Sequence, residues 1–271
     1  VGGDLPAGLG AWLWLAAAVP VICAGLAPGE RKRIRDIPGW TGPLLVAAGP
    51  DGSFERDGEG VPTWRVPVPQ AAERTKLWQA ATGNAALGAH LGRWHRHASA
   101  RMAELTRAAR YHAGLNGQST IGPGEIAAAA RSGAGGDVGT LAELLPEPIP
   151  DDALVLPPAV RSDLESLTAR CVERDVLTDG LGPASRARYR PGVRALFVGP
   201  SGTGKTLAAA WLATRLGLPL YRVDLASVTS KYIGETEKNL AQLFARAEHA
   251  EVVLLFDEAD SLFGKRTDVK D

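Results

Sequence analysis

Short apolar runs alternate with longer segments of mixed polarity along the second half of the chain. Each run has the length and composition of a strand, and the segments between them have the length of helices. The predicted strands are residues 194–198, 219–223 and 252–256, and the predicted helices are residues 158–177, 204–216 and 236–250. Strands that are apolar throughout are buried on both faces, so the pattern predicts an α/β domain with a parallel sheet between helices.

The first half of the chain has a less regular pattern, in which strand-like runs precede a series of helices. The predicted strands are residues 19–26, 43–48 and 64–68, and the predicted helices are residues 9–18, 70–81, 85–113 and 123–131. A Gly-rich stretch and a Pro-punctuated segment interrupt the pattern between residues 132 and 150. We therefore predict a mixed α/β to helical domain over residues 1–140, a linker over 141–150 and an α/β domain over 151–271.

The uncharged run between residues 5 and 29 has two interpretations. It is long enough to span a bilayer, and the basic residues that follow Glu30 are what an anchored helix often has at its end. However, Pro20 interrupts the run and several glycines dilute it, which favours a short buried helix followed by a buried strand. We favour the second interpretation and expect no membrane partner.

Charge and cysteine content limit the classes of function. Thirty basic residues balance thirty acidic ones, so the chain has no net positive charge to hold nucleic acid, and none is expected as a partner. The two cysteines, Cys23 and Cys171, are too few for a disulfide framework or a zinc site and fit a reducing cytoplasm. Because the histidines lack cysteine partners and suitable spacing, we interpret them as surface or core residues: His90, His95, His97 and His112.

Residues 199–206 match the pattern G-x-x-x-x-G-K-[ST] between a predicted strand and a predicted helix. The glycines allow successive backbone N–H groups to turn towards phosphates, and the helix start adds the positive end of its dipole. Lys205 is expected to contact the β- and γ-phosphates, and the Thr206 hydroxyl to bind Mg²⁺. The predicted nucleotide-binding residues are Gly199, Pro200, Ser201, Gly202, Thr203, Gly204, Lys205 and Thr206.

Two carboxylates, Asp257 and Glu258, follow the predicted strand 252–256. The carboxyl ends of parallel strands form the edge at which open α/β sheets bind ligands, so both should lie beside the phosphate loop. Asp257 is expected to hold Mg²⁺, and Glu258 to polarise the water that attacks the γ-phosphate. The sequence therefore predicts an ATPase that uses ATP and Mg²⁺, with Lys205 and Glu258 as its catalytic residues.

Three segments, residues 196–206, 230–239 and 255–261, resemble the AAA+ ATPases, specifically the AAA clade of hexameric protein-remodelling machines. The resemblance implies a ring, expected to be a homo-hexamer, that works on a protein substrate. In that family an aromatic–aliphatic–Gly triplet grips polypeptide in the central pore, and the matching residues here are Tyr232, Ile233 and Gly234. Residues 152–155 resemble the family's adenine-contacting segment, which implies that Leu154 and Val155 bind nucleotide.

The amino-terminal part has a fainter resemblance to the lid of an AAA module, over residues 66–78 and 113–131. Residues 1–140 are therefore expected to be the back half of a degenerate AAA module. This arrangement resembles bacterial ATPases associated with contractile injection systems, whose components are the implied partners. The chain lacks the family's γ-phosphate sensor, arginine fingers and C-terminal lid. We therefore expect it to be a segment of a longer protein.

Two other functions fit the same motifs. The first is a nucleic-acid motor or clamp loader, which would need a basic channel instead of the apolar Tyr232 and Ile233. The second is an assembly scaffold that only binds nucleotide, against which the intact Lys205 and Glu258 argue. We favour a cytoplasmic ATPase that remodels protein.

Overall fold

The computed structural model describes most of the chain in several stretches. They are residues 6–24, 26, 30–48, 52–64, 66, 68–133, 138, 141–145, 147–175, 192–225 and 235–257. The chain divides into two compact units, one formed by residues 1–67 with 240–245 and the other by residues 68–239 with 246–271. The linker at residues 141–150 and the two domains beside it stay a prediction.

The first unit contains two small sheets and a short helix. Helix α1 (Leu9–Leu15) precedes a parallel pair, β1 (Val21–Ala24) and β3 (Leu45–Ala48), while β4 (Ser53–Arg56) pairs with β2 (Arg31–Arg33) and β5 (Glu59–Gly60). The β1 strand was predicted to be buried, but its residues alternate between exposed and half-buried, and Val21 is 56% exposed. In the part of the chain that the structure describes, no helix is both long and apolar enough to cross a membrane.

One predicted strand of this region is absent from the described residues. Residues 64, 66 and 68 lie in no strand, and Trp64 and Val66 are 82% and 89% exposed. The alternation of apolar residues and prolines that suggested a strand is equally compatible with an extended segment that has no hydrogen-bonded neighbour.

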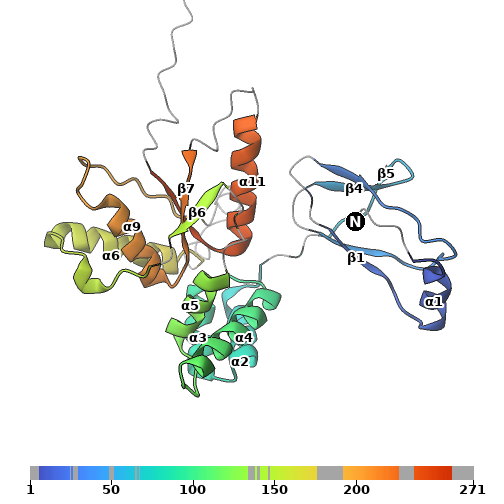
Figure 1. Ribbon diagram of the computed structural model, residues 1–271, viewed down its shortest axis with the longest axis horizontal. Helices are drawn as coiled ribbons and strands as arrows, with labels where there is room; N and C mark the ends of the chain where they lie inside the picture. Colours follow the sequence, from blue (N-terminus) through green and yellow to red (C-terminus); the bar gives the residue numbers. More distant parts are fainter. Residues whose placement is uncertain are drawn as a thin grey trace, which may run out of the picture. The chain divides into compact units, whose positions relative to one another are not determined.

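Four helices of the second unit form a bundle (Figure 1). They are α2 (Ala71–Thr82), α3 (Ala85–Trp94), α4 (Ser99–Leu115) and α5 (Pro123–Gly133). Asn84 starts α3 by accepting a hydrogen bond from the N–H of Leu87 at 3.0 Å, a regular N-cap. The core of the bundle is formed by the side chains of Trp78, Leu87, Leu91, Met102, Leu105, Ala109, Ile126, Ala129 and Ala130.

The single helix predicted over residues 85–113 is wrong, because the chain forms two helices there. Helix α3 ends at His95, whose backbone is extended with φ −120° and ψ 135°, and α4 begins only at Ser99. His95 and His97 are both buried, with exposures of 3% and 2%. Residues 95 and 97 turn to the same side only in an extended chain, so the burial of both rings favours the break.

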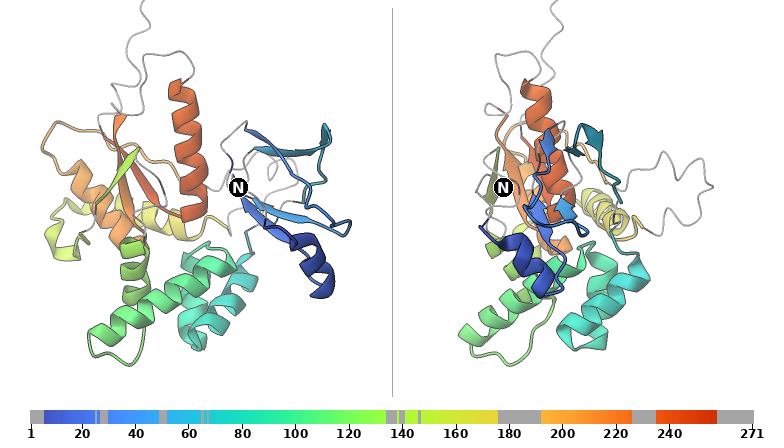
Figure 2. Two further views of the ribbon diagram at one scale, coloured as in Figure 1. Left: turned by 45° about the vertical axis from the view of Figure 1, so that its right-hand side comes forward. Right: turned by 90° about the vertical axis from the view of Figure 1, so that its right-hand side faces the viewer.

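The rest of the second unit is a small sheet with helices beside it (Figures 1 and 2). Helix α6 (Pro158–Val172) packs against α9 (Lys205–Leu216), and α9 contacts strands β7 (Leu220–Val223) and β8 (Val253–Phe256). Helix α11 (Glu235–Ala250) leads into β8. The 3-10 turn η2 (Asp151–Ala153) precedes α6. The shared core includes Leu154, Leu164, Leu167, Trp211, Leu212 and Leu216.

The sheet has the order β6-β7-β8, and it is not fully parallel. Strands β7 and β8 are parallel as predicted, whereas β6 (Ala142–Leu145) was not predicted and runs antiparallel to β7. The strand predicted at 194–198 is not formed: Leu196 and Val198 are 82% and 84% exposed, and residues 192–200 lie in no strand. Both edges of β7 are taken by β6 and β8, so the segment could pair only with the outer edge of β8, and among the described residues it does not.

Candidate nucleotide-binding site

The phosphate loop begins after the extended segment and ends where α9 begins at Lys205. Gly202 and Gly204 have φ values of +80° and +83°, a left-handed backbone that glycine adopts without strain. Gly204 is also the N-cap residue of α9. The role of this loop in binding phosphate stays a prediction.

Lys205 lies across its own loop. Its ammonium group donates hydrogen bonds to the carbonyl oxygens of Gly199 at 3.0 Å and Pro200 at 2.8 Å. The Thr203 hydroxyl donates to the same Pro200 oxygen at 2.9 Å. The loop is thus closed on itself around a positive charge at a helix N-terminus, which is an arrangement suited to an anion.

The two predicted Mg²⁺ ligands meet although 51 residues separate them. The Thr206 hydroxyl donates to Oδ2 of Asp257 at 3.5 Å. Thr206 is held by the first turn of α9, and Asp257 directly follows β8, which pairs in parallel with β7. A hydroxyl and a carboxylate at this separation form part of an oxygen-ligand set of the kind that Mg²⁺ prefers.

The structure describes two of the remaining predicted site residues, Leu154 and Val155. Leu154 is buried at 3% exposure in the core with α6 and α9, and its carbonyl oxygen accepts a hydrogen bond from Arg161 at 2.6 Å, whereas Val155 is 90% exposed. A role for either in binding adenine stays a prediction. Glu258, the catalytic carboxylate, and the pore triplet Tyr232, Ile233 and Gly234 lie outside the described residues.

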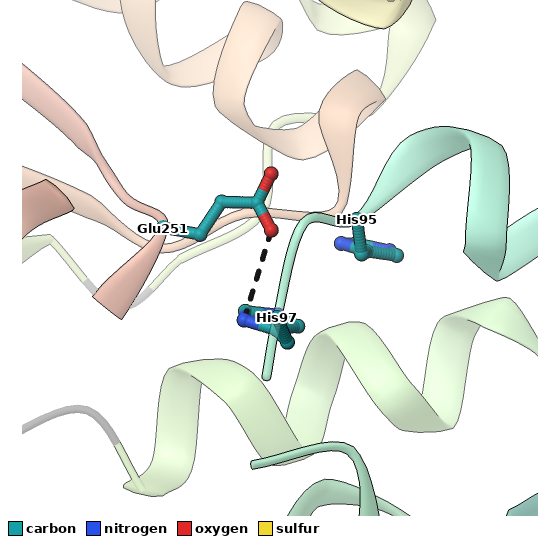
Figure 3. Close-up of side chains that lie close together, drawn as sticks. All are labelled: His95, His97 and Glu251. Carbon is teal, nitrogen blue, oxygen red and sulfur yellow. Dashed lines mark ion pairs between the residues drawn. The ribbon is translucent and has the colours of Figure 1, made fainter. Parts of the chain in front are cut away.

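A second group of polar residues, which the sequence did not reveal, lies near the start of β8. His95, His97 and Glu251 are buried, and one potential ligand atom of each lies within 4.8 Å of the others (Figure 3). Burial lowers the pKa of His95 to about 4, so its ring is neutral at physiological pH. These are features of a metal site, and the charges around them decide whether a cation fits.

Ion pairs extend from this cluster into its surroundings. Arg174 pairs with Glu251, and Asp175 pairs with both Arg74 and Arg96. A divalent cation bound to Glu251 would lie close to the guanidinium group of Arg174, and like charges repel strongly in a buried setting. We therefore interpret the cluster as a buried charge network and not as a metal site.

Comparison with known proteins decides the family of the carboxy-terminal part. Residues 195–271 match the family described as "ATPase family associated with various cellular activities (AAA)". This part of the chain is an AAA-family ATPase domain. An uncharacterized AAA family ATPase, y4kL, of Sinorhizobium fredii is 49% identical to this chain over 73 residues, which are 27% of this chain and 22% of that protein.

Two further relatives of the AAA domain come from animals. A katanin p60 ATPase-containing protein of Danio rerio is 38% identical over 106 residues, which are 39% of this chain and 22% of that protein. Spastin of Drosophila melanogaster is 41% identical over 91 residues, which are 31% of this chain and 12% of that protein. The matched part of the chain thus spans less than a quarter of each relative.

Proposed function

We propose that the AAA domain binds ATP with Mg²⁺ and hydrolyses it. The observation that carries the proposal is the contact between the Thr206 hydroxyl and the Asp257 carboxylate at 3.5 Å, beside the Lys205 ammonium on its glycine loop. Lys205 and the N-terminus of α9 supply positive potential for the β- and γ-phosphates. Thr206 and Asp257 would hold Mg²⁺, which neutralises charge on the phosphate oxygens.

Glu258 completes the proposed chemistry. It follows Asp257 in the sequence, and Asp257 directly follows β8. Open α/β sheets bind ligands at the carboxyl ends of their strands. A carboxylate there accepts a hydrogen bond from a water molecule and removes its proton as the oxygen attacks the γ-phosphate. Lys205 holds the phosphates in place during this attack, so the water and the phosphorus atom stay aligned.

We further propose that hydrolysis drives remodelling of a protein substrate in a ring of identical protomers in the cytoplasm. The sequence Tyr232-Ile233-Gly234 supports this step, because exposed apolar side chains on a glycine-hinged segment can hold polypeptide without reading its sequence. The similarity to katanin and spastin chains supports an AAA-type assembly. Components of a contractile injection system are the proposed substrates or partners.

Phosphate release measured with the full-length protein tests the hydrolysis. Glu258→Gln should bind ATP as the wild type does but turn it over about 100-fold more slowly, as expected when a general base is lost. Glu143→Gln is the control, since Glu143 lies in β6 of the same sheet in an exposed ion pair with Arg222 at 2.6 Å. Wild-type turnover in Glu258→Gln would show that another group activates the water.

A further inference from the structure

Glu251 joins the end of helix α11 to strand β8, in a conformation that glutamate rarely adopts. Its φ is +54°, in the left-handed region, and its N–H donates to the carbonyl of Ala247 at 3.1 Å as the helix ends. Glycine usually occupies this position at a helix C-terminus because a side chain is strained there. A buried non-glycine residue in this conformation is retained only when its surroundings over-determine it.

Contacts of the Glu251 side chain hold the residue in this conformation. Its carboxylate, only 7% exposed, accepts hydrogen bonds from Arg174 and from the backbone N–H of Arg96, and lies 3.6 Å from Nδ1 of His97 (Figure 3). Burial raises the pKa of Glu251, but His97, Arg174 and the Arg96 N–H outweigh it and lower that pKa below its ordinary value. The carboxylate is therefore ionised and held from three directions.

A second carboxylate continues the same network into the helical bundle. Asp175 lies 3.1 Å from Nε of Arg96 and 2.5 Å from Nη2 of Arg74. Arg74 is itself 2% exposed and donates to the carbonyl oxygens of Gly92 at 3.1 Å and Pro69 at 2.8 Å. Since Arg174 and Asp175 are neighbours just after α6, this one turn binds both β8 and the bundle α2–α5.

We propose that Glu251 is a positioning residue that fixes strand β8, and hence Asp257, relative to the helical bundle. Strand β8 begins two residues after Glu251 and ends directly before Asp257. All four residues of β8 pair with β7, so on this inference a displacement at its start would reach Asp257 at its end. Glu251 thus acts on the Mg²⁺ ligand through the strand, without contacting nucleotide, and the inference rests on the proposed function.

If Glu251 positions Asp257, its loss should reduce the gain in nucleotide affinity that Mg²⁺ gives over EDTA. We would measure the Kd of a fluorescent ATP analogue for the full-length protein in Mg²⁺ and in EDTA, together with the melting temperature. Glu251→Gly removes the carboxylate and at the same time relieves the left-handed backbone. The gain in affinity from Mg²⁺ should fall about tenfold or more, as for other residues that support a metal ligand, while the Kd in EDTA stays unchanged.

Asp57→Gly is the matched control. Asp57 has the same left-handed backbone, with φ +53°, but its carboxylate lies in exposed ion pairs with Arg33 and Arg56. This variant should keep the wild-type effect of Mg²⁺. Arg174→Gln removes the guanidinium group that hydrogen-bonds Glu251 and leaves the Glu251 backbone unchanged. It serves if Glu251→Gly does not fold, and it should reduce the same gain.

The outcomes separate the inference from the function on which it rests. A wild-type gain from Mg²⁺ in both Glu251→Gly and Arg174→Gln, with lower melting temperatures, would assign the network a purely structural role. Equal losses of affinity in Mg²⁺ and in EDTA would overturn the inference as well. If the wild-type chain itself binds nucleotide no better in Mg²⁺ than in EDTA, the proposed role of Asp257 fails, and the inference fails with it.

Discussion

Trp211 links the stability of the AAA domain to the position of the phosphate loop. It lies in the middle of α9, the helix that begins with Lys205, and is 1% exposed. Its indole N–H donates to Oδ1 of Asp151 at 2.7 Å, and the guanidinium groups of Arg161 and Arg215 lie over its ring at 5.8 and 5.7 Å. Truncating this side chain removes packing, a hydrogen bond and two cation–π contacts at once.

The expected cost follows from these contacts. A buried tryptophan replaced by alanine leaves a cavity that costs about 3–5 kcal/mol, and two partly exposed cation–π contacts add about 1 kcal/mol. We therefore expect Trp211→Ala to lower the free energy of unfolding by about 4–6 kcal/mol. Trp211→Phe keeps most of the packing and loses mainly the hydrogen bond. Because the Asp151 carboxylate is 62% exposed and rehydrates, that loss should cost about 1 kcal/mol.

Urea unfolding followed by far-UV circular dichroism measures these differences, and nucleotide affinity measured on the same samples shows their effect on the loop. Trp64→Ala is the control, since Trp64 is 82% exposed and its removal should change stability by no more than about 0.5 kcal/mol. If Trp211→Ala cost no more than Trp64→Ala, the packing of α9 against α6 described above would be wrong. If Trp211→Phe cost as much as Trp211→Ala, the hydrogen bond and not the ring would stabilise this helix.

Two further predictions concern the phosphate loop and the pore triplet. Lys205→Ala should abolish ATP binding, because it removes the only side-chain cation of the loop. The control Lys76→Ala, on the exposed face of α2, should leave the Kd for ATP unchanged. Retained ATP binding by Lys205→Ala would refute the role assigned to Lys205. Tyr232→Ala should keep basal ATPase within a few-fold of wild type but lose stimulation by unfolded polypeptide, whereas the exposed Tyr111→Ala should keep both. Stimulation by DNA or RNA instead of polypeptide would favour a nucleic-acid motor.

The parts of the fold that depend on local signals were predictable from the sequence. Helix α9 was predicted at residues 204–216 and spans Lys205–Leu216, because the glycine before it and the apolar spacing within it both lie inside one short segment. Strand β8 was predicted at 252–256 and spans Val253–Phe256 for the same reason. Asp257 was predicted directly after this strand, and it follows β8 with its carboxylate 3.5 Å from the Thr206 hydroxyl.

The parts that depend on distant partners were not predictable. Strand β6 lies between a Gly-rich stretch and a run of prolines, and only its pairing with β7 makes it a strand. The apolar run 194–198 has the composition of a buried strand but pairs with none of the described strands. The break between α3 and α4 depends on the burial of His95 and His97, whose contact with Glu251 spans more than 150 residues of sequence.

Strand β8 is the element at which these two kinds of contact meet. At its carboxyl end, Asp257 contacts Thr206 in the first turn of α9, and both residues belong to motifs that can be recognised in the sequence. Before its amino end, Glu251 contacts Arg174 and the Arg96 backbone, and none of these residues belongs to a sequence motif. On the inference above, a shift of the helical bundle that displaces Glu251 would also change the distance between Asp257 and Thr206. On the proposed function, the affinity for Mg²⁺-nucleotide therefore depends on how the bundle is held, and by linkage nucleotide binding in turn changes how firmly the bundle is held.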